Sequence, residues 1–173
     1  METNQVDNRE AWQRGPVEGI PALLQPVAHS LFHTLEGVEE EMKDFPDELL
    51  WKRPAEVASV GFHLLHLTGV LDRLFTYARG EMLSQNQLKA LAVEHDTQQG
   101  DKSAGDLVQA FRDQVALALV QLKHTDEKHL TDARSIGRKK IPTTVAGLLF
   151  HAAEHCQRHF GQLLVTSRVL RDN

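Results

Sequence analysis

The chain has 173 residues, with 19 Lys and Arg against 24 Asp and Glu, which gives a formal net charge of −5 when histidine is neutral. This balance excludes a strongly basic nucleic-acid-binding protein, and we expect no nucleic-acid partner. With 41% hydrophobic residues, the composition is that of an ordinary globular domain with one core. The longest strictly apolar run, Val115 to Val120, is too short to span a membrane, so we expect no membrane partner.

The N-terminal segment 1–18 is polar and shows no periodicity, which predicts a mobile tail before a single domain over residues 19–173. The segment lacks the apolar centre of a signal peptide, so we expect a cytoplasmic protein. Cys156 is the only cysteine, so no disulfide can form within the chain.

Apolar residues that recur at helical spacing predict four long amphipathic helices. We expect them at residues 21–43, 56–79, 104–123 and from Thr143 or Thr144 to about 171. A shorter helix is predicted at 83–94, and residues 44–54 and 124–142 are expected to be loops. Little of the sequence has the β-branched pattern of strands. The fold class expected is therefore all-α, a four-helix bundle whose long connections allow a crossover.

Histidine is the unusual residue of this chain: there are ten, and seven of them lie in groups three or four residues apart. His151, His155 and His159 form one ridge on the last predicted helix. From the centre of that helix's apolar stripe, His159 lies at roughly 60°, His155 at roughly 100° and His151 at roughly 140°. His155 and His159 therefore border the core, whereas His151 faces outward. Two imidazoles one turn apart can bind one metal ion, and a third ligand must come from another helix, where the candidates are His63 and His66.

A competing motif is His151-Ala-Ala-Glu154-His155, which matches the inverted zinc-protease pattern H-x-x-E-H. Such enzymes use a further glutamate downstream, and no glutamate follows Glu154 in this chain. We therefore reject this interpretation. The motifs of nucleophilic hydrolases, P-loop proteins and dinucleotide-binding proteins are also missing.

Two segments resemble the DinB/YfiT-like superfamily of metal-dependent helical bundles: SVGFHLLHL at residues 59–67 and HCQRHFGQL at residues 155–163. DRLFTY at 72–77 and IPTT at 141–144 agree, and the likeness runs from about Ile20 to the C-terminus. The resemblance implies an up-down-down-up bundle and a metal site made by His66, His155 and His159. It also implies that the chain is a possible homodimer, and members of the superfamily include thiol-dependent transferases and isomerases.

The helical wheel alone favours His63 over His66, because His63 lies closer to the apolar stripe of its helix. His66 shares a secondary ridge with Phe62, Arg73 and Tyr77. This ridge makes Arg73 and Tyr77 candidates for lining a ligand pocket, and the alternative is packing against a neighbouring helix. His63 is then expected behind the ligands or at the surface.

Other candidates are weaker. We interpret His29 and His33 as partly buried or surface histidines, and Cys156 as an apolar filler, with a soft metal ligand as the alternative. The one basic cluster comprises Arg134, Arg138, Lys139 and Lys140. It is either a solvated loop or a surface that attracts an anionic substrate.

Three neutral imidazoles leave an open coordination position, as in catalytic zinc sites. The sequence thus predicts a metal-dependent enzyme with a small-molecule substrate, a thiol-dependent transferase or a hydrolase. Zn or Ni suits these ligands best, and Fe, Mn and Cu are the alternative metals. A low-molecular-weight thiol is a candidate second cofactor. No carboxylate is placed as a general base, which slightly favours thiol chemistry. The alternative is a non-catalytic bundle that binds metal or another ligand.

Overall fold

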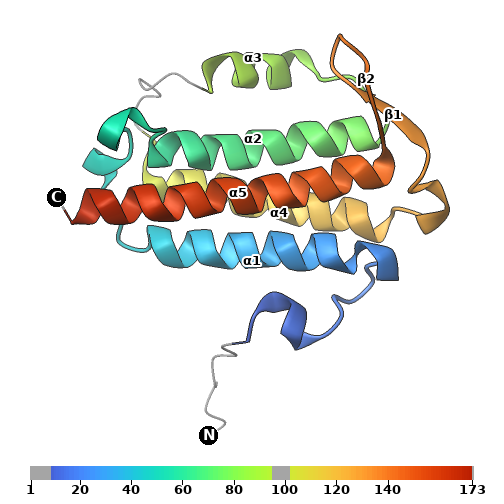
Figure 1. The fold of residues 1–173 in the computed structure, drawn as a ribbon, viewed down its shortest axis with the longest axis horizontal. Coiled ribbons are helices and arrows are strands. Elements are labelled where there is room, and N and C mark those ends of the chain that lie inside the picture. The colour runs from blue at the N-terminus through green and yellow to red at the C-terminus, as the bar shows by residue number, and fades with distance from the viewer. Residues whose placement is uncertain (1–8, 95–101, 173) are drawn as a thin grey trace, which may run out of the picture.

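The computed structural model describes residues 9–94 and 102–172. Within these ranges the chain forms four long helices, one short helix and a hairpin (Figure 1). The elements are α1 (Gln25–Met42), α2 (Val60–Ala78), α3 (Gln85–Val93), α4 (Ala104–Lys123), β1 (Ala133–Ile136), β2 (Ile141–Thr144) and α5 (Val145–Arg171). The helix positions match those predicted to within a few residues. Pro26 in the first turn of α1 follows a short 3₁₀ turn, Ala22–Leu24, which delays the start of the helix.

The four long helices form an up-down-down-up bundle, as the resemblance implied. In Figure 1, α1 and α5 run in one direction and α2 and α4 in the other. Both α1 and α2 pack against α4 and α5, so α1 and α2 occupy opposite corners of the bundle. The parallel pair α2 and α4 needs a long crossover, and α3 lies in this crossover, outside the bundle against α2.

Three of the four long helices begin with a side-chain cap. The side chains of Ser59, Ser103 and Thr144 each accept a hydrogen bond from a backbone N–H in the first turn of α2, α4 and α5 respectively. Thr144, one of the two expected starting residues of the last helix, therefore fixes where the histidine-rich helix α5 begins. No helix in the described ranges is both long and apolar enough to cross a membrane.

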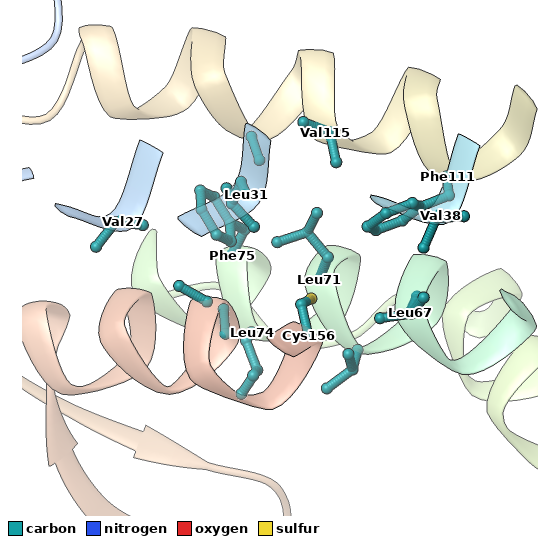
Figure 2. Close-up of a cluster of buried hydrophobic side chains, with 14 of the residues drawn as sticks. Val27, Leu31, Val38, Leu67, Leu71, Leu74, Phe75, Phe111, Val115 and Cys156 are labelled. Atoms are coloured by element: carbon teal, nitrogen blue, oxygen red, sulfur yellow. The ribbon is translucent and has the colours of Figure 1, made fainter. Parts of the chain in front are cut away.

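The core lies between the four helices, and Figure 2 shows a group of its side chains. Leu31 of α1, Leu67 of α2 and Phe111 of α4 are fully buried there. Cys156 of α5 is also fully buried in this core, and burial raises the pKa of its thiol to about 12. A protonated thiol among buried apolar side chains acts as an apolar filler, and among the described residues Cys156 belongs to no group with metal-ligand spacing.

The segment 124–142, predicted to be a charged loop, contains most of an antiparallel hairpin instead. Its strands have four residues each, too short to show alternation, and Pro142 lies in the second strand opposite Ser135. Proline is tolerated because both strands of a two-stranded sheet are edge strands. Arg134 fixes the hairpin to the bundle, since its Nε donates to the carbonyl of Ala78 at the end of α2 (2.9 Å). The other residues of the basic cluster are exposed at the turn.

Residues 9–18 fall in the predicted tail, and in the structure they lie against α1. Ala11–Arg14 form a 3₁₀ turn with Ala11 buried, and Arg14 binds both carboxylate oxygens of Glu36 at 2.6 and 2.8 Å. Residues 1–8 of that predicted tail are outside the described residues.

Gly61 and Gly161 provide a test of the packing. A Cβ on Gly61 would lie 2.5 Å from the Trp51 ring, so we predict that Gly61→Ala lowers the free energy of unfolding by about 1–3 kcal/mol through overpacking. Gly161 is exposed on α5, and none of the described atoms lies within 4 Å of an added Cβ. Gly161→Ala should therefore raise the free energy of unfolding by about 0.5–1 kcal/mol. Urea unfolding measures both changes in the free energy of unfolding. Equal changes in the two variants would contradict the close packing of Trp51 against Gly61 of α2.

Candidate metal centre

Three histidines from two helices meet at the outer edge of the α2–α5 contact. His66 of α2 and His155 and His159 of α5 each place one ring nitrogen so that the three atoms lie within 4.8 Å of one another. Nε2 of His66 is 2.9 Å from Nε2 of His155, and the ring centroids of His66 and His159 are 4.3 Å apart. The structure therefore brings together the three residues that the resemblance indicated.

The surroundings of His155 and His159 on α5 favour the neutral form of both rings. Burial lowers the pKa of His155 to about 4, with further lowering by Arg158 and His66. Burial likewise lowers the pKa of His159 to about 3, with help from His66 and His155. Histidine binds metal only in its neutral form, so this environment prepares both rings as ligands. Three closely spaced imidazole nitrogens are a donor set consistent with a divalent metal ion.

His66 and His159 are each held by a side chain behind the cluster, through the ring nitrogen that faces away from it. Nδ1 of His66 donates to Oε2 of Glu94 at 2.9 Å, which directs the unprotonated Nε2 into the cluster. Nδ1 of His159 lies 3.1 Å from Nδ1 of His63, a buried residue whose own pKa is lowered to about 4 by burial and then by His66. Of the two positions expected for His63, the structure thus shows the one behind the ligands.

His155 has a different partner. The Arg158 guanidinium contacts its Nδ1, and because arginine can only donate, this nitrogen accepts and the proton of the neutral ring is on Nε2. Coordination of a metal through Nε2 requires the other tautomer, in which Arg158 no longer donates to Nδ1. Arg158 is exposed and can move away.

Glu94 is the residue at this site that the sequence analysis missed. It lies directly after α3 and is buried, with 5% of its surface exposed, and no spacing pattern connects it with His66. Arg73 binds its carboxylate through Nη1 and Oε1 at 2.7 Å and through Nη2 and Oε2 at 3.3 Å. Burial by itself raises the pKa of Glu94, but hydrogen bonds from His66 and Arg73 outweigh it, and the pKa lies below its ordinary value. Glu94 is therefore ionised.

The other residues of the predicted ridge have separate positions. Phe62 stacks on His66, with ring centroids 5.3 Å apart and planes at 15°. Arg73 reaches the cluster only through Glu94. Tyr77 is buried beneath the hairpin and does not line the histidine cluster. It lines a cavity of about 480 Å³ together with Gly80 and Arg134.

His151, Glu154 and His155 form a second group with metal-ligand spacing, and they are the residues of the rejected H-x-x-E-H motif. Nδ1 of His151 is 2.6 Å from Oε1 of Glu154, and the two side chains are 46% and 41% exposed. His151 is thus half-exposed and is not part of the group with His66. The second group comes from a single helix, whereas the group with His66 joins two helices and has side chains behind two of its rings. We therefore regard the group with His66 as the better metal site.

His29 and His33 lie elsewhere on the bundle. Nε2 of His29 is 3.0 Å from the carbonyl oxygen of Gly15, and His33 packs edge-on against Phe160. Both are partly buried or exposed, as expected.

A crossover four-helix bundle with a histidine cluster between its second and last long helices defines the structural class. Residues 24–163 match the family model of the DinB superfamily, and the chain belongs to this superfamily. Its structure is similar to the crystal structure of a protein from Streptococcus pneumoniae, with a TM-score of 0.61 and 16% sequence identity over 84% of this chain and 88% of the other. That likeness concerns the fold alone. None of the curated proteins matches the chain at a significant level.

Metal content tests the choice between the two groups. We predict that His66→Ala and His159→Ala each lose the bound divalent ion, because either change leaves only two ligands. His151→Ala should keep it, since His151 is not part of the group with His66. Elemental analysis of protein purified without a histidine tag measures this. Metal loss in His151→Ala together with metal retention in His66→Ala would indicate that the second group, and not the group with His66, binds the ion.

Acid should destabilise the metal-free protein. In the folded state the pKa values of His63, His155 and His159 are about 4, 4 and 3, below the ordinary value of 6.5. As pH falls through about 6.5 the unfolded chain takes up protons first, so the stability present above this pH is lost as it falls toward about 4. Thermal unfolding between pH 7.5 and 5 should show this decrease, and the double variant His155→Gln/His159→Gln should show a shallower one. Equal pH dependence would refute these low pKa values.

Proposed function

We propose that this DinB superfamily protein is a metal-dependent enzyme that holds one divalent ion, zinc or nickel, on His66, His155 and His159 and acts on a small molecule. The convergence of three imidazoles from α2 and α5 is the observation that carries the proposal. A bound ion with only three protein ligands would supply Lewis acidity at an open position, where it lowers the pKa of a thiol or a water.

The chain's own residues prepare this position. Glu94 keeps the proton of His66 on Nδ1, so that Nε2 is free for coordination. The His63 ring supports His159 on the opposite side, away from the cluster. Phe62 covers one face of the His66 ring and limits the access of water to it. His63 also lines, with Val165 and Thr166, an apolar cavity of about 380 Å³ whose lining includes none of the three cluster histidines.

Thiol transfer is favoured over hydrolysis because the carboxylates that contact the cluster histidines are engaged. Hydrolysis needs a base within reach of the water it activates. Both oxygens of Glu94 accept from Arg73, one of them also from His66, and its lowered pKa makes it a weak base. Glu154 is paired with His151. A thiol needs less help, because its ordinary pKa is already near 8.5 and coordination by a metal suffices to remove its proton.

The experiment begins with tag-free protein loaded with one equivalent of zinc or nickel. Glutathione, cysteine and coenzyme A are each offered with 1-chloro-2,4-dinitrobenzene, whose chloride the thiol displaces, and p-nitrophenyl acetate is offered without thiol. We expect metal-dependent thiol conjugation that His66→Ala abolishes. Ester hydrolysis without a thiol would instead indicate a hydrolase. A stoichiometrically loaded protein that is inactive with all three thiols and with the ester would overturn the proposal in favour of a non-catalytic metal-binding bundle.

A further inference from the structure

Gly69 lies on α2 between His66 and Arg73, at the point where the Glu94 carboxylate meets the helix. A Cβ built on Gly69 would come 2.3 Å from Oε1 of Glu94 and 2.5 Å from Nη1 of Arg73. Both distances are far below van der Waals contact, so any side chain at this position would displace the ion pair. Glycine costs a helix about 1 kcal/mol relative to alanine, and here it opens the space in which the carboxylate rests.

His66 and Arg73 extend from α2 on either side of this space, three residues before and four residues after Gly69. Residues at these spacings share one face of a helix. The Glu94 carboxylate therefore receives N–H groups from both directions: Nδ1 of His66 at 2.9 Å, and the two Nη atoms of Arg73 at 2.7 and 3.3 Å. Glu94 and Arg73 are both buried, with 5% and 8% of their surfaces exposed.

Each member of this group depends on the others. An ionised carboxylate is costly to bury, and the Arg73 guanidinium offsets that cost through a two-point contact. The carboxylate in turn accepts the proton on Nδ1 of His66, which fixes the tautomer and the plane of the ring. Ring orientation and basicity of a metal-binding histidine are both set by such a partner on its outer nitrogen.

We propose that Gly69, Arg73 and Glu94 act as one unit that positions His66 for metal binding, with Glu94 as the positioning residue. This inference rests on the proposed metal site and adds to it a residue from outside the four long helices. Because Glu94 directly follows α3, the placement of α3 on α2 is part of the construction of the site. The helix α3, which contributes no member to the group with His66, thereby becomes necessary for full affinity.

Two substitutions test the unit without removing a ligand. Gly69→Ala adds one methyl group that displaces the carboxylate, and Glu94→Gln keeps the shape of the side chain but removes its charge. Gly161→Ala is the matched control, because it adds the same methyl group to α5, two residues after His159, where no described atom lies within 4 Å. Zinc affinity is measured by competition with a chromophoric chelator, and the visible spectrum of the cobalt-loaded protein reports on ligand geometry.

We expect Gly69→Ala and Glu94→Gln to weaken zinc binding by about 10- to 100-fold and to alter the cobalt spectrum. Gly161→Ala should change neither. A purely structural role would lower the melting temperature and leave the cobalt spectrum of the folded fraction unchanged. If Gly69→Ala does not fold, Glu94→Gln, which retains the packing, decides alone.

The two proposals fail in different ways. Wild-type protein that binds no zinc or cobalt would overturn the metal site itself. Wild-type protein that binds one equivalent, with Glu94→Gln binding equally tightly and giving the same cobalt spectrum, would leave the metal site intact and overturn the positioning unit.

Discussion

Along most of their length α2 and α5 pack directly against each other, and the residues at the centre of this contact are apolar and fully buried. Leu67 and Cys156 are two of them, and each has a histidine as its neighbour in the chain, His66 and His155 respectively. Neighbouring residues in a helix are about 100° apart around its axis, so a residue next to the centre of a contact emerges at its rim. Burial of the apolar residues thus places the histidines of both helices at the same outer edge, where they face each other.

Partial burial of polar rings at the edge of a core is energetically unfavourable, and two features of the structure reduce this cost. The imidazoles of His63, His155 and His159 stay neutral, so that burial does not isolate a charge. Glu94 stays charged, but its carboxylate is held by Arg73. Among the described residues, no buried side-chain nitrogen or oxygen lacks a hydrogen-bond partner. The cluster is therefore a fully connected network, which gives the ligand rings defined orientations.

The helices and the ligand-bearing faces could be predicted from the sequence because they follow from local periodicity. Apolar spacing located the four long helices, and the i, i+4 relation put His155 and His159 at the border of the core. Periodicity alone favoured His63 over His66, and the family resemblance was needed to choose the histidine that enters the cluster. Glu94 could not be found, since its contact with His66 depends on how the crossover folds back onto α2. The hairpin was missed because its strands are shorter than the window in which alternation can be recognised.

The cluster joins parts of the chain that are far apart in sequence: His66 and His155 are separated by 89 positions. During synthesis from the N-terminus, α2 leaves the ribosome long before α5 exists. The cluster is therefore among the last features of the molecule to form, because it requires α5 to be packed against α2. Any ion it takes up would tie this last helix to the second and close a loop that contains the whole of α4. Metal binding would then stabilise the folded full-length chain. It would not stabilise truncated products that end before α5, because they lack His155 and His159.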